Sequence, residues 1–299
     1  RESLLERLFA AGAFDGVILN SVQMPAAYPF LVDVAPSVFV AHNVEAVSAR
    51  QNAARATGLH ERLLFEREAR LVGAVEAGLC RSASAVHTLT REDAQMLGLA
   101  GSERAIPLPL SLGRAPRPDD GRRTHDIGLI GTWSWAPNRA GLDWFLERVV
   151  PRLPSTMSIA IAGQIEGRPP VPANVAFLGR VPDAQAFIHA SRILALPTTA
   201  GTGVQLKTLE MLEEGLPAVA TPLALRGIEG ERPGTLSVTE DPAAFAEALA
   251  AGVEAERAER LTRGGGGDFA ARRRDEARAA AMRGMGLLAK ARELRELRA

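Results

Sequence analysis

The chain lacks most features of secreted, membrane-spanning or nucleic-acid-binding proteins. Its 299 residues include one cysteine, Cys80, which excludes an internal disulfide framework and fits a reducing compartment. The 35 Lys and Arg side chains balance 35 Asp and Glu side chains, whereas a nucleic-acid binder usually has a strong basic excess. No apolar run approaches the roughly 18 residues that span a bilayer. We therefore expect a cytoplasmic protein with no nucleic-acid partner, and leave open a peripheral contact with the inner face of the membrane.

The first residue is Arg1 and not Met. Residues 1–11 have the pattern of an amphipathic helix, and a strand pattern follows directly. We therefore expect an N-terminal domain that is truncated at its start.

Short apolar runs alternate with helical patterns along most of the chain, which is typical of parallel α/β folding. The first half predicts one long helical stretch, residues 45–78, and strands at residues 17–20, 38–42, 85–89 and 105–108. The proline-rich residues 107–118 predict an interdomain linker. The second half predicts helices at residues 141–150, 184–190, 204–214 and 242–255. Its predicted strands are residues 127–130, 158–162, 175–178, 193–196, 218–220 and 236–238.

The most informative stretch, residues 196–221, has the pattern strand, glycine-rich loop, helix, glycine stop, strand. Gly201 and Gly203 allow positive φ and a close approach of backbone to a ligand. The start of the following helix suits a diphosphate, because its N–H groups are free and its dipole end is positive. Lys207 would supply a cation for phosphate, and Glu210 a carboxylate for paired ribose hydroxyls. From spacing alone, an exposed Lys207–Glu210 surface pair is an equally good interpretation.

This stretch resembles the donor loop of retaining glycosyltransferases with the GT-B fold. The resemblance is to family 4 of the glycosyltransferase classification, which is also called glycosyl transferases group 1. Three further segments match in order and spacing: residues 131–146, 159–163 and 175–183. The resemblance extends over residues 16–238, which is most of the chain. It implies two Rossmann-like, doubly wound α/β domains facing a cleft.

The resemblance also implies roles for individual residues. Glu210 would bind the ribose hydroxyls, and the loop from Gly201 to Gly203 would face the donor sugar and phosphates. The family motif usually has two glutamates with seven residues between them, but Thr202 stands where the first would be. A subset of the family reads Gly-x-Gly-x-x-x-Lys-x-x-Glu, which residues 201–210 match.

A basic pair clamps the diphosphate in many members of the family, on the loop after the first strand of the second domain. This chain matches that region only partly, with Gly131, Asn138 and Arg139. We expect these three residues to contact the donor, and Lys207 to supply the missing positive charge.

In the first half, His42 lies at the carboxyl end of a predicted strand and resembles the acceptor-side histidine of the family. We expect it to be catalytic, positioning the acceptor hydroxyl or stabilising the transition state by hydrogen bonding. The alternative is a structural histidine bonded to a backbone carbonyl.

We expect Glu45 to cap the helix that follows. For His87, substrate contact and packing are equally open.

No His, Cys, Asp or Glu cluster has metal-ligand spacing, and there is no Asp-x-Asp pair. We therefore expect no metal and no cofactor. The resemblance implies a nucleoside-diphosphate sugar as donor substrate. The helix dipole and Lys207 would stabilise the departing diphosphate.

The predicted domains are an acceptor-side domain at residues 1–113, a nucleotide-sugar donor domain at residues 114–263, and a flexible four-glycine break with one or two terminal, solvent-facing helices at residues 264–299. The predicted activity is a hexosyltransferase-type transfer, with retention, to a glycan or lipid-linked sugar in polysaccharide biosynthesis. Two alternatives stay open: a GT-B sugar-nucleotide epimerase or hydrolase, and an inactive sugar-nucleotide-binding protein.

Overall fold

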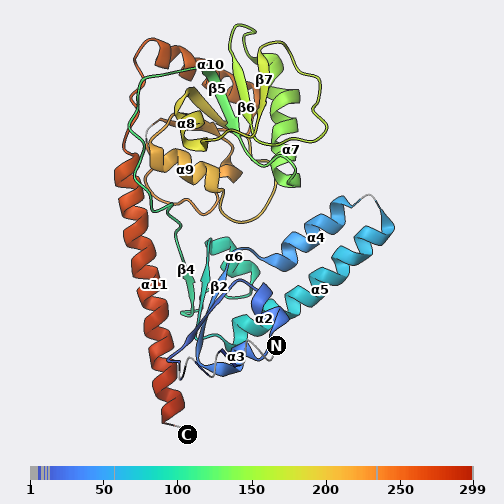
Figure 1. Cartoon of the computed structure of the whole chain (residues 1–299), viewed down its shortest axis with the longest axis vertical. Helices are drawn as coiled ribbons and strands as arrows, with labels where there is room; N and C mark the ends of the chain where they lie inside the picture. Colours follow the sequence, from blue (N-terminus) through green and yellow to red (C-terminus); the bar gives the residue numbers. More distant parts are fainter. Residues whose placement is uncertain are drawn as a thin grey trace. The chain divides into compact units, whose positions relative to one another are not determined.

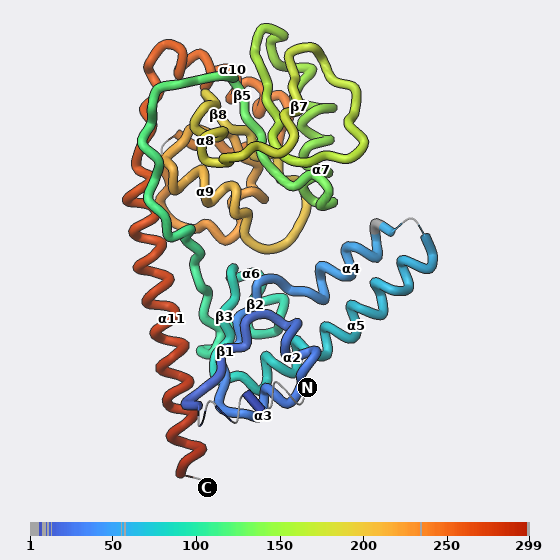
Figure 2. The backbone as a smooth tube through the Cα atoms, viewed as in Figure 1, coloured from blue at the N-terminus to red at the C-terminus, as the bar shows by residue number. Residues whose placement is uncertain are grey.

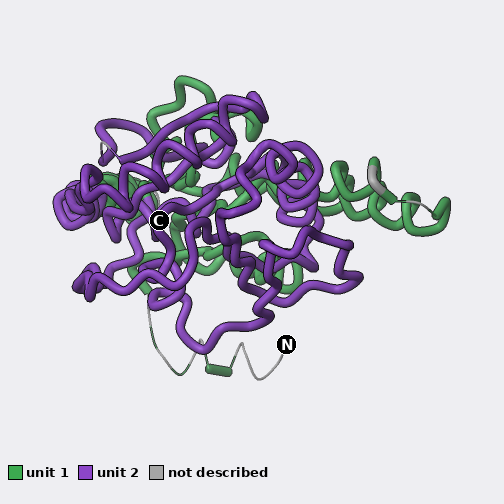
Figure 3. The backbone as a smooth tube through the Cα atoms, turned by 90° about the horizontal axis from the view of Figure 1, so that it is seen from above, with its two compact units in different colours: residues 1–109, 275–299 green, residues 110–274 purple. Residues whose placement is uncertain are grey.

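The computed structural model describes residues 6–7, 10, 12, 14–56, 58–233 and 235–297. Most of the helix predicted at residues 1–11 lies outside these described residues. The chain forms two compact units (Figure 3). Unit 1 comprises Arg1–Pro109 and Asp275–Ala299, and unit 2 comprises Leu110–Arg274. The sequence placed the divisions after residues 113 and 263, whereas the units divide after residues 109 and 274.

Unit 1 contains a parallel four-stranded sheet in the order β1-β2-β3-β4. Its strands lie where the sequence predicted them: β1 (Val17–Asn20), β2 (Ser37–Ala41), β3 (Ala85–Thr88) and β4 (Ala105–Pro107). Consecutive strand residues point to opposite faces, so Phe39 packs into a cluster with Leu79 and Leu99, whereas Val38 packs with Ala280 and Leu288. Its helices are α2 (Gln23–Ala27), α3 (Leu31–Val34), α4 (Glu45–Arg55), α5 (Leu59–Ser82), α6 (Arg91–Met96) and the second part of α11 (Gly266–Glu296).

The single helical stretch predicted at residues 45–78 is two helices, α4 and α5, which form a hairpin (Figures 1 and 2). The chain leaves the helical conformation at Ala56, and Gly58 is extended with ψ 137°. The carboxylate of Glu76 accepts from the backbone N–H groups of Glu45 at 2.6 Å and Ala46 at 3.0 Å. Glu76 on α5 therefore caps α4 by hydrogen bonds, whereas Glu45 lies in the first turn of α4, where the sequence predicted it and where an acid is favoured.

Unit 2 contains a parallel six-stranded sheet in the order β10-β9-β8-β5-β6-β7. The six strands are β5 (His125–Ile130), β6 (Ile159–Ala162), β7 (Val175–Gly179), β8 (Ser191–Leu196), β9 (Ala218–Ala220) and β10 (Leu236–Val238). The helices are α7 (Ala136–Trp144), the π-helical turn η1 (Phe145–Val149), η2 (Val150–Arg152), α8 (Ala184–His189), α9 (Leu206–Glu214), η3 (Pro222–Leu225) and α10 (Pro242–Arg257).

The unit 2 sheet is doubly wound, as predicted. Ile193 and Ala195 of β8 share a cluster with residues of α7 and α10, whereas Leu194 and Leu196 share one with residues of α8 and α9. The two helix pairs therefore cover opposite faces. Strand β5 lies in the middle, with β8 on one side and β6 on the other. The chain runs outward from β5 through β6 to β7, and then in the opposite direction from β8 through β9 to β10. Ligands of such sheets bind beyond the carboxyl ends of the strands at this switch point, which here are β5 and β8.

The four-glycine segment is packed against the end of α9 and is not the flexible break that the sequence suggested. Gly215 ends α9 in the left-handed conformation with φ 65°, as predicted. Gly264 donates its N–H to the Gly215 carbonyl at 3.0 Å. A Cβ on Gly266 would lie 2.3 Å from the Glu213 carbonyl oxygen. Glycines are needed here because the two backbones touch.

Helix α11 is likewise less solvated than its arginine content suggested. Arg273 is 2% exposed, and its guanidinium donates to the carbonyls of Leu110 at 2.9 Å and Gly227 at 3.3 Å. Phe269 and Ala270 of the same helix are also buried. The start of α11 is therefore part of the core of unit 2.

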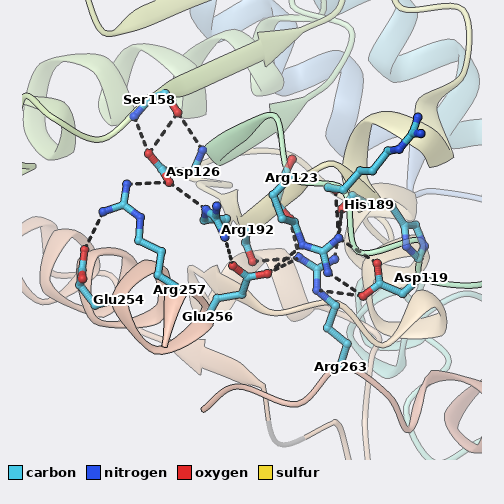
Figure 4. Close-up of polar contacts among 12 residues, drawn as sticks. Asp119, Arg123, Asp126, Ser158, His189, Arg192, Glu254, Glu256, Arg257 and Arg263 are labelled. Carbon is cyan, nitrogen blue, oxygen red and sulfur yellow. Dashed lines mark hydrogen bonds and ion pairs between the residues drawn. The ribbon is translucent and has the colours of Figure 1, made fainter. Parts of the chain in front are cut away.

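An ion-pair network joins the amino ends of the unit 2 strands to the end of α10 (Figure 4). Glu256 accepts from Arg123 at 2.8 Å and also pairs with Arg192. Asp126 accepts from Arg257 at 2.9 Å and lies 3.2 Å from Arg192. This network lies at the edge of the sheet opposite to the carboxyl ends. In the part of the chain that the structure describes, no helix is both long and apolar enough to cross a membrane.

Candidate functional site

The loop between β8 and α9 has the backbone that the sequence predicted. Gly201 has φ 112° and Gly203 has φ 74°. A Cβ on Gly201 would lie 3.2 Å from the Pro137 side chain at the start of α7. The glycine therefore lets the loop lie against α7. Thr202 is half-buried between the two glycines. Among the described residues, no side chain caps the start of α9. The Thr208 N–H donates to the Gln205 carbonyl at 3.0 Å, which leaves the N–H groups of Leu206 and Lys207 in the first turn for an anion.

Lys207 connects α9 to the start of α7. Its Nζ donates to Oδ1 of Asn138 at 2.9 Å, and Nδ2 of Asn138 donates to the Thr132 carbonyl at 3.1 Å. Nζ also lies 5.8 Å from the ring centroid of the buried Trp133. Burial lowers the pKa of Lys207 from 10.5 to about 8. Among the described residues no carboxylate pairs with Lys207, so the exposed Lys207–Glu210 pair considered above is not formed.

Gly131 follows β5 directly and is needed for packing. Its N–H donates to the Ala162 carbonyl at 3.2 Å. A Cβ on Gly131 would lie 3.1 Å from the Trp133 ring. A Cβ on Gly163 would lie 1.8 Å from the Gly131 carbonyl oxygen. The ends of β5 and β6 therefore approach each other closely beneath Trp133.

Arg139 makes its polar contacts with α7 and with the loop after β6. Its Nε donates to Asp143 at 2.8 Å, one turn along α7. Its Nη1 donates to the Glu166 carbonyl at 2.9 Å, in the loop after β6. The charge of Arg139 is therefore balanced within α7, whereas Lys207 has only a neutral amide as its polar partner among the described residues.

Glu210 pairs with Arg114, from the segment that precedes β5. The Glu210 side chain is 19% exposed and that of Arg114 is 43% exposed. The same helix also holds this segment by its backbone, because Glu213 accepts from the Leu112 N–H at 3.1 Å and Glu214 from the Arg117 N–H at 2.7 Å. Sequence reasoning missed Arg114, and the only available signal was its place in the predicted linker.

His42 belongs to unit 1, and the eight expected donor residues belong to unit 2. His42 lies just beyond β2 and is exposed, with Nε2 2.6 Å from Oδ1 of Asn20. This partner is a side chain and not the backbone carbonyl of the structural alternative. Sequence reasoning did not identify Asn20 as a site residue, although it placed Asn20 at the end of a strand.

His87 is a packed histidine. It is buried, and Nδ1 lies 3.1 Å from the Ile106 carbonyl oxygen. A Cβ on Gly284 of α11 would lie 2.4 Å from Nε2, so no space remains on that side of the ring. Burial lowers the pKa of His87. Within the described residues, no group of three or more His, Cys, Asp or Glu side chains is arranged to hold a metal ion.

The site in unit 2 thus gathers Gly131, Asn138, Gly201 and Lys207 at the carboxyl ends of β5 and β8, two adjacent strands. Residues 124–254 match the family model described as Glycosyl transferases group 1. No curated protein matches the sequence.

Solved structures resemble the chain over most of its length. TarM matches with 15% identity and a TM-score of 0.62, over 96% of this chain. The chain spans only 57% of TarM. HepE from Anabaena in complex with UDP-glucose matches with 16% identity and a TM-score of 0.61, over 93% of this chain and 80% of HepE. Sucrose-phosphate synthase from Thermosynechococcus elongatus matches with 15% identity and a TM-score of 0.60, over 98% of this chain and 77% of the synthase. The chain has the GT-B fold, and its match to the glycosyl transferases group 1 model is confined to residues 124–254.

Proposed function

We propose that this chain is a glycosyltransferase whose unit 2 binds a nucleoside-diphosphate sugar at the carboxyl ends of β5 and β8. One observation carries the proposal: Lys207, the uncapped start of α9 and the positive-φ glycine loop converge at the switch point of the sheet. A desolvated cation beside free N–H groups is suited to a diphosphate.

The chemistry assigned to unit 2 is stabilisation of the leaving group. Negative charge develops on the diphosphate as the bond to the sugar breaks. The first-turn N–H groups of α9 and the Lys207 ammonium would receive that charge. Glu210 would accept hydrogen bonds from the ribose hydroxyls once it has separated from Arg114. No metal or further cofactor is part of this proposal.

The proposal also includes retention of configuration at the anomeric carbon of the transferred sugar. The proposed acceptor is a hydroxyl group of a glycan or lipid-linked sugar. The match of residues 201–210 to the family motif supports retention. His42, exposed at the carboxyl edge of the unit 1 sheet, is the proposed catalytic residue on the acceptor side. The HepE structures in complex with UDP and with UDP-glucose make UDP-sugars the first donors to test.

Isothermal titration with UDP-, GDP- and ADP-sugars tests the donor site. We expect one class of nucleotide to bind, and Glu210→Ala to abolish that binding. Glu247→Ala is the matched control, because Glu247 is exposed on α10 of the same unit. A chain that binds none of these nucleotides would falsify the donor site.

Product analysis separates transfer from the alternatives. Transfer produces a glycosylated acceptor, whereas a hydrolase releases free sugar and an epimerase returns a nucleotide sugar. We expect His42→Ala to lose turnover and keep nucleotide binding. Full transfer activity in that variant would exclude the catalytic role of His42.

A further inference from the structure

The carboxyl edge of the unit 1 sheet carries a polar pair, Asn20 and His42, of which the proposed function uses only His42. Asn20 is the last residue of β1, and His42 is the first residue after β2. The parallel register places Asn20 opposite Val40, two residues before His42. Residues two apart on a strand share a face, so the Asn20 and His42 side chains meet, with 2.6 Å between Oδ1 and Nε2.

This contact determines which ring nitrogen of His42 holds the proton. A carboxamide oxygen only accepts hydrogen bonds, so Nε2 must be the donor. In the neutral ring, Nδ1 then has a free lone pair and can only accept. A hydrogen bond to Asn20 in this geometry favours one orientation of the ring and the tautomer with the proton on Nε2.

The backbone next to Asn20 is in a strained conformation. Ser21 has φ 74°, and Glu259 is the only other non-glycine residue with positive φ in the part of the chain that is described. Such strain is concentrated at functional sites, where the surrounding structure enforces it. The Ser21 N–H donates to the Val40 carbonyl at 2.9 Å, so β1 stays joined to β2 up to this turn. The turn then leads into α2, which leaves Asn20 at the edge of the sheet beside His42.

We infer that Asn20 is a positioning residue for His42: it holds the imidazole in the Nε2–H tautomer and presents Nδ1 to the acceptor hydroxyl. The inference rests on the proposed function, in which His42 is on the acceptor side. The hydroxyl donates its hydrogen bond to Nδ1, and this orients its oxygen for attack on the sugar. Asn20 acts through His42 and does not itself contact the acceptor.

Two-bond ¹H–¹⁵N correlation spectra of the ¹⁵N-labelled chain test the tautomer without any substrate. Spectra recorded at pH 9 report on neutral rings, since the ordinary histidine pKa is about 6.5. We expect the Nε2–H pattern for His42 in the wild type, assigned by its loss in His42→Ala. Asn20→Leu is expected to give a mixture of tautomers, and Asn20→Asp, which keeps an accepting oxygen, to retain the Nε2–H pattern. Asn52→Leu, an exposed position on α4, is the control.

Steady-state kinetics with the donor found by titration provide the second readout. Asn20→Leu is expected to lower kcat about tenfold and to leave the KM for the donor unchanged, because the donor site lies in unit 2. A wild-type Nδ1–H pattern, or an unchanged His42 pattern in Asn20→Leu, overturns the positioning role. A changed tautomer with an unchanged kcat overturns it as well. A chain that binds no nucleotide sugar contradicts the proposed function, whereas the tautomer spectra decide the Asn20–His42 contact on their own.

Discussion

Arg114 and Glu210 form an ion pair within unit 2, on the carboxylate that the proposed function assigns to the ribose. Arg114 also lies 3.5 Å from Glu214, one turn further along α9. In the proposed function, a donor nucleotide therefore displaces Arg114 from Glu210. In the proposed function, nucleotide binding thus removes a contact between α9 and the segment before β5. Glu213 and Glu214 of α9 also accept hydrogen bonds from this segment.

Removing Arg114 is expected to tighten nucleotide binding. In Arg114→Ala, Glu210 is free before the nucleotide arrives. Partly exposed ion pairs are worth about 0.2–1 kcal/mol, so the gain in affinity is at most about fivefold. Isothermal titration of wild type and variant measures it. Arg117→Ala is the matched control, because Arg117 pairs with Asp183 at 2.9 Å and not with Glu210. Weaker binding in Arg114→Ala would instead make Arg114 a nucleotide contact.

Lys207 is expected to make donor binding depend on pH above neutrality. Its pKa is lowered to about 8 by burial, so it is mostly protonated at pH 7 and loses its charge as the pH rises towards 9. Only the protonated form attracts the diphosphate, so the donor Kd should rise through this range, by up to about tenfold per unit. A nucleotide sugar is the right ligand, because its diphosphate has no ionisation in this window.

Lys207→Arg separates this effect from other titrating groups. Guanidinium stays charged beyond pH 10, so the variant should show the same Kd at pH 7 and pH 9 even if its affinity is lower. Titrations of both proteins at several pH values measure the profiles. A flat profile in the wild type would show that Lys207 does not contact the diphosphate.

The sequence predicted the sheet of each unit well because strand signals are local. The ten strands in the described part of the chain lie within two residues of their predicted ends, since most are short, mainly apolar runs between turns. The break between α4 and α5 was missed because Ala-, Arg- and Glu-rich residues surround it. Gly58 alone did not mark a boundary there, since an isolated glycine is tolerated in helical patterns.

Contacts between residues distant in sequence were not predictable in the same way. Glu76 caps a helix that begins 31 residues earlier, and Arg114 reaches a glutamate 96 residues later. Gly201, Gly203, Lys207 and Glu210 could be predicted together as candidates because they lie within one loop and helix. Asn20 was not, because its significance depends on the pairing of β1 with β2, which brings it to His42.

Glu256 is expected to stabilise unit 2 without contributing to ligand binding. Its side chain is 10% exposed and faces Arg123, Arg192 and Arg263. Glu256→Gln leaves these arginines without its charge, and breaking such a buried pair costs about 3 kcal/mol. Urea unfolding followed by tryptophan fluorescence reports on unit 2, because Trp133, Trp135 and Trp144 all lie there.

Glu254→Gln is the control for this measurement. Glu254 pairs with Arg257 on the same helix but is 56% exposed, so its loss should change stability by less than about 1 kcal/mol. Nucleotide affinity should be unchanged in both variants under folding conditions, since the network lies at the amino ends of the strands. Equal stabilities of the two variants would show that the buried network does not stabilise the unit.

Gly201→Ala is expected to weaken nucleotide binding by displacing the donor loop. The φ of 112° is strained for alanine, and the new Cβ would lie 3.2 Å from the Pro137 side chain. The loop must then move away from α7, which separates it from Asn138 and Lys207. Gly230→Ala is the matched control, because Gly230 has φ 85° but nothing within 4 Å of a new Cβ. Both variants carry the backbone strain of about 1–2 kcal/mol, but only Gly201→Ala should lose affinity in titrations. An equal affinity in the two would place the donor away from this loop.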